Sequence, residues 1–339
     1  MQVVCYIIIR NLSNKMYKHN FVIFGSKWDL YKFAFSDIYG MDNVKYFALS
    51  GLKHNLFAFI KRLQQHYPTS SILSRIWIKL FPKIDFTTSK PIIFIYMWGV
   101  LTNNATSKAI EYLRKKYKNS KHILFNTDLI ATRNSTYTAQ DAKRDYDLVL
   151  SFDPGDCIKY DFVYHPLVFS KYKLHNLPIE YDIVFIGQGK NRLQEIFASY
   201  DFFVSKGLNV KYVLIHIPKD QRRFVAGIEY VDSIPYLKNL QYVEQSKCIL
   251  EIMQKSGMGY TQRGCEIVGL NKKLITNNSF IANAPFYNAK YISVFTSVNN
   301  IDLDFIEHLK NNEIVEYGDE QRDRMSPKEL LSFVEKHIS

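Results

Sequence analysis

The sequence predicts an α/β protein of two doubly wound domains that face each other across a cleft. Short apolar, β-branched or aromatic runs alternate with amphipathic helical stretches along the chain, a pattern typical of parallel sheets. A polar stretch around Pro178 divides this alternation into two series. The length of 339 residues also exceeds one ordinary core of roughly 100–200 residues.

The first domain is predicted over residues 1–175. Residues 52–86 are rich in Phe, Trp and basic residues and lack strand alternation, so we expect an inserted helical hairpin over the sheet edge. Residues 1–15 precede a good first strand, and we expect them to be an upstream extension or an added edge strand, with Met16 as the rival start of translation. Strands are expected, in chain order, at residues 21–25, 44–49, 91–99, 122–128 and 147–153.

The second domain is predicted over residues 176–320 and begins with a polar linker, residues 176–182. We expect the remaining residues, 321–339, to form a helix that packs back on the first domain. Ser326, with Glu329 three residues later, is a capping-box pattern that places the start of this helix at Pro327. Strands are expected at residues 183–187, 210–217, 228–232, 247–253, 272–278 and 291–295, and helices at residues 191–207 and 260–270.

The composition excludes a disordered chain and favours a reducing compartment. Hydrophobic residues make up 47% of the chain and charged residues only 22%, so the protein can bury enough apolar surface to offset its conformational entropy. The sequence has no run of roughly 18–20 apolar residues, so no membrane span is expected. We expect a cytoplasmic protein, because four cysteines lie far apart in neither a metal-ligand spacing nor a disulfide framework: Cys5, Cys157, Cys248 and Cys265.

The positive charge limits the partners. There are 44 Lys and Arg against 32 Asp and Glu, a net charge of +12. Such an excess suits nucleic acid, an anionic lipid surface or a phosphorylated substrate, and a solvated basic face is the alternative. No helix-turn-helix, RNA-recognition or zinc-ligand pattern supports nucleic acid. Because the histidines are scattered and no DxD pattern ends a strand, no catalytic metal is expected.

The stretch from Leu250 to Asn278 holds the most informative motif. A buried strand ends, a glycine pair opens the loop, and a helix carries Glu266 about one turn from its start. Backbone N–H groups at a helix N-terminus, with a guanidinium beside them, suit a diphosphate, and a carboxylate one turn further suits the hydroxyls of a ribose. The alternative is that Arg263 and Glu266 merely form a surface ion pair. The donor-binding residues expected here are Gly259, Thr261, Gln262, Arg263 and Glu266.

A second glycine-containing turn follows the first strand of the second domain. It contains Gly187, Gly189, Lys190 and Arg192, whose backbone and basic side chains can approach a phosphate from the opposite wall of the cleft. The turn lacks the third glycine of a dinucleotide fingerprint, and no acidic residue stands at the distance that NAD needs, so no cofactor is expected. The alternative is a tight turn that needs glycine for its backbone angles.

This arrangement resembles the donor-binding domain of GT-B glycosyltransferases, which have two Rossmann-like domains. In retaining members a helix after a glycine-rich loop presents a glutamate to the donor ribose. Glu266 takes that place here, with IVGLNKK as the following turn and LIT as the strand. Together with FDPGDCIKY upstream, this segment is similar to bacterial glycosyltransferases of capsule or lipopolysaccharide synthesis, over most of the chain from about Phe21. Retaining members carry another glutamate eight residues earlier, where this chain has Met258, so the stereochemistry stays open.

The acceptor side is expected in the first domain, where Asp128 and Asp153 follow strands. An inverting transferase needs a general base to deprotonate the acceptor hydroxyl, normally a carboxylate or a histidine. Asp128 and Asp153 are therefore the candidate catalytic residues, and helix N-caps or turn formers are their alternative roles. We expect His165, which precedes a proline, to be a structural histidine.

The resemblance implies a metal-independent glycosyltransferase whose donor substrate is a nucleotide sugar. The acceptor would be a glycan or a lipid-linked oligosaccharide, and the positive charge would hold the enzyme as a peripheral protein at the inner face of the cell membrane. Two alternatives stay open. One is a polysaccharide-modifying transferase of the same architecture, such as a pyruvyl transferase, and the other is a non-catalytic basic protein that binds nucleic acid.

Overall fold

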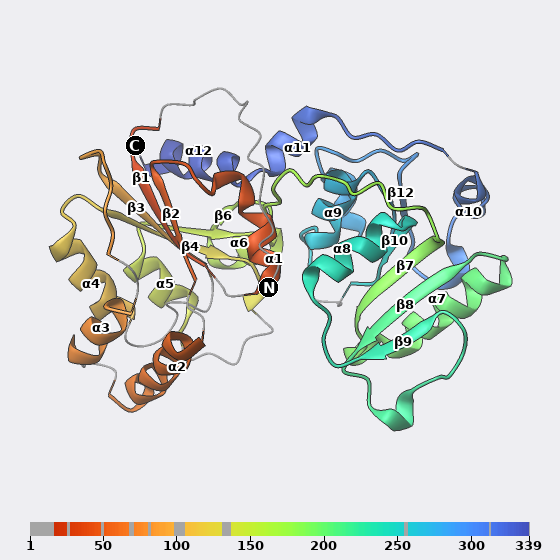
Figure 1. Cartoon of the computed structure of the whole chain (residues 1–339), viewed down its shortest axis with the longest axis horizontal. Coiled ribbons are helices and arrows are strands. Elements are labelled where there is room, and N and C mark those ends of the chain that lie inside the picture. Colours follow the sequence, from red (N-terminus) through yellow and green to blue (C-terminus); the bar gives the residue numbers. More distant parts are fainter. Residues whose placement is uncertain are drawn as a thin grey trace.

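The computed structural model confirms the predicted fold class. Two parallel six-stranded sheets, each flanked by helices, form the two halves of the molecule (Figure 1). The predicted extension over residues 1–15 and Met16 lie outside the described part of the chain. The structure describes residues 17–25, 28–48, 51–67, 71–80, 83–97, 106–130, 137–253, 257–311 and 313–338.

The first sheet has the strand order β2-β1-β3-β4-β5-β6. Its five predicted strands are present with small shifts at their ends, and the two-residue β6 was not predicted. Residues 52–86 contain two helices, as expected. The strands are β1 (Asn20–Phe24), β2 (Val44–Phe47), β3 (Ile92–Met97), β4 (Lys121–Asn126), β5 (Leu148–Ser151) and β6 (Val163–Tyr164), and the helices are α1 (Asp29–Ala34), α2 (Gly51–His66), α3 (Ser71–Ile78), α4 (Thr106–Lys116), α5 (Ala139–Asp145) and α6 (Pro154–Tyr160).

The second sheet has the order β12-β11-β10-β7-β8-β9, so the strand order reverses between β7 and β10. Ligands of doubly wound sheets bind at the carboxyl ends of the strands at such a reversal. The strands are β7 (Tyr181–Gln188), β8 (Val210–Ile215), β9 (Ile228–Val231), β10 (Ser246–Glu251), β11 (Lys273–Thr276) and β12 (Ile292–Val294), and the helices are α7 (Leu193–Ser205), α8 (Tyr236–Glu244), α9 (Gln262–Leu270), α10 (Leu303–Lys310), α11 (Asp319–Met325) and α12 (Pro327–Ile338).

Helices cover both faces of each sheet, which explains why the strands read as continuous apolar runs. All five residues of β1 are buried. Val22 and Phe24 pack into the core on one face of the first sheet, and Phe21 and Ile23 pack into the core on the other face. Strands that are buried on both sides cannot alternate apolar and polar residues, so a parallel sheet is the arrangement that this sequence favours.

The chain crosses between the two halves twice, and Asp37 contacts both crossings. Val168 packs in the core of the first domain, whereas Phe169 packs in the core of the second; the predicted boundary at residue 175 lies a little after this point. The Asp37 carboxylate accepts hydrogen bonds from the Lys171 amide at 3.1 Å and from the Ser326 hydroxyl at 2.9 Å. Beyond Ser326, α12 lies against the first sheet (Figure 1). Its apolar residues Leu330, Leu331 and Val334 belong to that core.

Cys157, Cys248 and Cys265 are free thiols. In the described ranges, no helix is both long enough and apolar enough to span a bilayer.

Candidate active site

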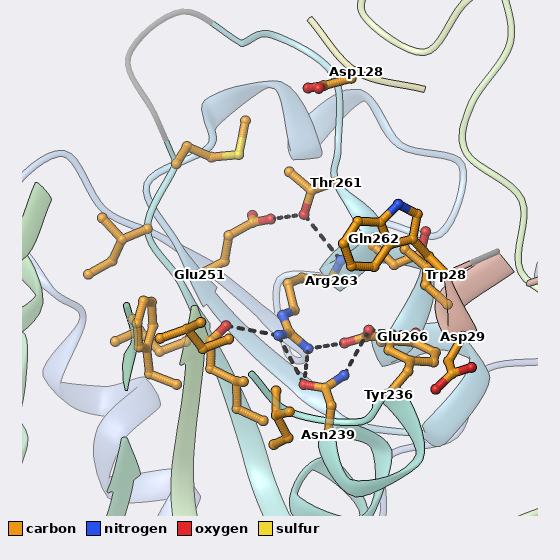
Figure 2. Close-up of a pocket in the computed structure, with 18 of the residues that line it drawn as sticks. Trp28, Asp29, Asp128, Tyr236, Asn239, Glu251, Thr261, Gln262, Arg263 and Glu266 are labelled. Carbon is orange, nitrogen blue, oxygen red and sulfur yellow. Dashed lines mark hydrogen bonds and ion pairs between the residues drawn. The ribbon is translucent and has the colours of Figure 1, made fainter. Parts of the chain in front are cut away.

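A cleft of about 870 Å³ lies between the two domains, at the point where the second sheet reverses its strand order. The second domain contributes the end of β10, the start of α8 and the N-terminus of α9. The first domain contributes the start of α1 and the loop after β4. Figure 2 shows polar and charged side chains from these segments around the cavity. The site therefore needs both domains.

The N-terminus of α9 forms the central part of this wall. Thr261 is the N-cap: its hydroxyl accepts a hydrogen bond from the Arg263 amide at 3.1 Å and donates one to the Glu251 carboxylate. Thr261 and Gln262 both line the cleft. Because the peptide dipoles of a helix give its N-terminus a partial positive charge, this wall favours an anionic ligand.

Arg263 and Glu266 form the ion pair that the sequence left as an alternative, but the pair is buried rather than on the surface. Glu266 is 1% exposed and also accepts hydrogen bonds from the Tyr236 hydroxyl at 2.7 Å and from the side-chain amide of Asn239 at 3.4 Å. Arg263 donates further hydrogen bonds to the Asn239 side chain and to the Ile186 carbonyl (Figure 2). Burial, together with the adjacent Glu266 carboxylate, holds the pKa of Tyr236 well above its usual range. The charge of Arg263 is thus neutralised within the protein.

Arg192 is the cleft-lining cation whose charge is not neutralised in this way. Its guanidinium donates to the backbone carbonyls of Gln188 and Ile252. Among the described residues, no carboxylate oxygen lies within 4.0 Å of that guanidinium. Burial lowers the pKa of Arg192, which shows that the charged group is partly withdrawn from water. A ligand with negative charge would compensate this loss of solvation.

Glu251 is a cleft residue that the sequence analysis missed. It ends β10 and is buried, and its carboxylate accepts hydrogen bonds from the hydroxyls of Thr261 and Thr276, the latter at 2.6 Å. Burial raises the pKa of Glu251. The sequence does contain a signal for this residue, because Glu251 is an acidic residue at the end of an apolar strand that runs toward the cleft.

The first domain contributes Trp28, Asp29, Tyr31 and Asp128 to the opposite wall. Trp28 is 68% exposed and lies at the N-cap of α1. Asp29 pairs with Lys32 at 2.9 Å, and Asp128 accepts the Leu129 amide at 2.9 Å. Asp29 and Asp128 are the first-domain carboxylates in the described lining of the cleft. Trp28 and Asp29 were missed, although they follow the first strand almost directly.

Asp153 does not line the cleft, and its proposed catalytic role is corrected. It is 2% exposed and caps the N-terminus of α6, where it accepts the Asp156 amide at 2.9 Å. Its second oxygen accepts the amides of Met258 at 2.6 Å and Gly259 at 2.9 Å. Three backbone donors occupy this carboxylate, so it has a structural role as an N-cap and as a bond between the domains.

Four predicted donor-binding residues lie outside the lining of the cleft: Gly187, Gly189, Lys190 and Gly259. A Cβ on Gly259 would lie 2.3 Å from the Phe152 carbonyl oxygen, so this glycine allows two backbones to approach closely. A Cβ on Gly189 would lie 2.7 Å from the Ile217 side chain. The Lys190 side chain is exposed. The structure therefore gathers Asp128, Arg192, Thr261, Gln262, Arg263 and Glu266 in one cleft.

The described residues contain no group of three or more His, Cys, Asp or Glu that could hold a metal ion.

No family model matches the sequence, and no curated protein matches it. Solved structures with a similar fold include a sucrose-phosphate synthase from Thermosynechococcus elongatus (10% identity, TM-score 0.49, 94% of this chain and 98% of that chain). Another is a DNA-modifying β-glucosyltransferase solved with and without UDP-glucose (14% identity, TM-score 0.45, 94% of this chain and 95% of that chain). A third is a protein assigned as a UDP-N-acetylglucosamine 2-epimerase from Listeria monocytogenes (9% identity, TM-score 0.47, 91% of this chain and 91% of that chain). These names describe different reactions, so the chemistry is argued from the site alone.

Proposed function

We propose that the protein is a glycosyltransferase that moves a sugar from a nucleotide-sugar donor to a glycan or lipid-linked oligosaccharide of cell-surface polysaccharide synthesis. One observation supports this most: a cleft at the strand reversal of the second sheet combines the N-terminus of α9 with Arg192, a cation that forms no ion pair among the described residues. Both features suit a nucleoside diphosphate. The resemblance of the 250–278 segment to GT-B donor domains agrees with this proposal.

The reaction forms a bond from the acceptor oxygen to the anomeric carbon and breaks the bond from that carbon to the diphosphate. Arg192 and the N-terminus of α9 stabilise the charge that develops on the departing diphosphate. Glu266 holds the side chains of Arg263 and Tyr236 in place in the wall of the cleft. Because these groups neutralise the phosphate charge, we propose a metal-independent transfer, for which a chelator leaves turnover unchanged.

The proton of the acceptor hydroxyl passes to a carboxylate of the first domain. Asp128 and Asp29 are the candidates, because both line the cleft. A general base of this kind contributes roughly 10²–10⁴-fold to turnover. Asp128→Asn and Asp29→Asn identify the base: the correct substitution lowers turnover and leaves nucleotide affinity unchanged. If both variants turn over like the wild type, no carboxylate base acts here.

A titration with nucleoside diphosphates of different bases tests the donor site. We expect one base to bind with about micromolar affinity, and Arg192→Gln to weaken it by at least about tenfold, because a hydrogen bond to a charged group contributes roughly 1.5–3 kcal/mol. Lys190→Gln is the matched control, since it removes the same charge two residues away on an exposed side chain outside the cleft. It should change the affinity less than about twofold.

Two results would contradict the proposal. If Arg192→Gln and Lys190→Gln weaken binding equally, the effect is one of general charge. If no nucleotide binds and the protein instead retains DNA in a salt-sensitive manner, the alternative of a basic nucleic-acid-binding protein gains support.

The cellular location of the enzyme is part of the same proposal. The net charge of +12 suits a peripheral enzyme at the inner, anionic face of the cell membrane, where a lipid-linked acceptor is available.

A further inference from the structure

The segment that forms α2 and α3 carries positive charge without any negative charge. From Gly51 to Ile84 the sequence has six Lys or Arg and no Asp or Glu. Over the whole chain, 44 basic residues accompany 32 acidic ones, so this segment departs strongly from the average. The two helices form a hairpin along the bottom of the first domain in the view of Figure 1, and α3 packs against α4.

The same hairpin exposes large apolar side chains. Leu52, Leu56 and Phe59 of α2 follow one another at spacings of four and three residues and therefore share a helix face. Leu52 is 87% exposed and Phe59 is 57% exposed. Ile72 and Ile76 of α3 are exposed at a spacing of four residues. The hairpin is anchored by other residues, among them the buried Ile60, which belongs to the core of the first domain.

Four cations of the hairpin form no ion pair within the described part of the chain, whereas Lys83, beyond α3, lies 3.8 Å from Asp85. Lys53, Arg62, Arg75 and Lys79 are exposed, and none of them forms an ion pair with a described carboxylate. Arg75 lies over the ring of Tyr112 at 5.9 Å. An exposed surface with both free positive charge and aliphatic side chains matches a bilayer with anionic headgroups, because the cations meet phosphates while the apolar side chains enter the acyl boundary.

We infer that the α2–α3 hairpin docks the protein on an anionic phospholipid surface. Four of the five exposed large apolar side chains described on α2 and α3 are Leu or Ile, and only Phe59 is aromatic. This composition favours a bilayer over nucleic acid, which rewards cations and stacking aromatic rings. The position of the hairpin agrees with the cleft: α2 begins shortly after β2 ends at Phe47, hence at the carboxyl edge of the first sheet, which faces the cleft. Docking there would present the cleft to a lipid-linked acceptor, and only this last step rests on the proposed function.

Vesicle sedimentation with the full chain tests the inference. We expect the wild type to sediment with vesicles of phosphatidylcholine and phosphatidylglycerol and not with phosphatidylcholine alone. The triple variant Lys53→Glu, Arg62→Glu, Lys79→Glu should lose more than tenfold in partitioning, since each surface charge contributes on the order of fivefold. The double variant Leu52→Ser, Phe59→Ser should also lose severalfold, because it removes the apolar anchors.

A control variant separates a docking surface from the effect of net charge. Lys173→Glu, Lys219→Glu, Lys290→Glu changes the charge equally at exposed sites outside the hairpin and should bind anionic vesicles within about twofold of wild type. If the control and the hairpin variant lose binding equally, or if the wild type binds neutral vesicles as well as anionic ones or no vesicles at all, the inference is wrong. Nucleotide affinity, measured without vesicles, reports separately on the proposed donor site, so the docking inference and the donor-site proposal fail independently, while the membrane location proposed above depends on the vesicle result.

Discussion

Glu266 and Arg263 illustrate how a buried ion pair differs from an exposed one of the same spacing. Removing one partner of a buried pair leaves an uncompensated charge out of water, which costs roughly 3–5 kcal/mol. We therefore expect Glu266→Ala to lower the free energy of unfolding by about that amount, as measured by urea denaturation. Loss of nucleotide binding in this variant would thus not identify a contact, which is why Arg192 is the better probe of the proposed donor site.

Glu307 provides the matched control. It pairs with Lys310 at 2.8 Å, also three residues apart, but both side chains are exposed. Glu307→Ala should change the free energy of unfolding by less than about 1 kcal/mol. Equal losses in the two variants would contradict the view that burial of Glu266 decides its role.

Five of the nine residues predicted for donor binding line the cleft, but the sequence did not show what each of them contacts. Arg263 and Glu266 were recognised by their place on a helix after a glycine loop. That Arg263 is neutralised depends on Tyr236 and Asn239, which α8 brings from a distant part of the chain. A local motif contains no information about such partners. Asp153 was open between a base and an N-cap for the same reason, because the amides of Met258 and Gly259 come from the other domain.

At the scale of elements, the loop before α9 is held against the first domain by close backbone approach. A Cβ at Gly259 would meet the Phe152 carbonyl oxygen at 2.3 Å, and a backbone atom cannot move aside as a side chain does. We expect Gly259→Ala to lower the free energy of unfolding by about 1–3 kcal/mol, the usual range for overpacking. Thermal or urea denaturation measures this loss.

Gly257, two residues earlier, is the control for this loop. Its Cβ would meet the flexible end of Met253 at 3.1 Å and the Leu129 side chain at 3.4 Å, and both can shift. Gly257→Ala should therefore be tolerated with a loss of less than about 1 kcal/mol. If both glycine variants are equally stable, the close approach of Gly259 to Phe152 does not limit the loop.

The strands were predictable because each is a short apolar run that is buried on both faces. The elements that were missed lack this signal. β6 has two residues, and α6 begins at Pro154, in a stretch with few apolar residues. Helix α12 starts at Pro327 as predicted, and the Ser326 hydroxyl accepts the Lys328 amide at 3.3 Å and donates to Asp37, so this residue also carries a tertiary contact that the sequence does not show.

At the scale of the whole molecule, two buried histidines make stability depend on pH. Burial lowers the pKa of His122 to about 3 and that of His165 to about 4, so both are neutral in the folded protein. The unfolded chain takes up their protons first, below an ordinary pKa of about 6.5. The stability that they contribute is complete above about pH 6.5 and is lost as the pH falls toward 4 and 3, by at most ~1.4 kcal/mol per pH unit for each histidine.

Urea denaturation at several pH values between neutral and about 4 measures this dependence. His122→Gln keeps a donor and an acceptor for Tyr96 and Ser120 but does not titrate in this range, so its stability should fall less steeply with pH. His308→Gln, at an exposed site, should keep the wild-type slope. A wild-type slope in His122→Gln would show that other groups carry the acid sensitivity.

Asp37 also sets how the two halves can move. Its carboxylate bonds both chain crossings, through Lys171 and Ser326, whereas the Asp153 carboxylate is the separate bond to the loop at Met258 and Gly259. A motion that breaks the second set of bonds and keeps the first would pivot near Asp37. In such a motion both chain crossings stay tethered to the first domain at one carboxylate while the walls of the cleft separate.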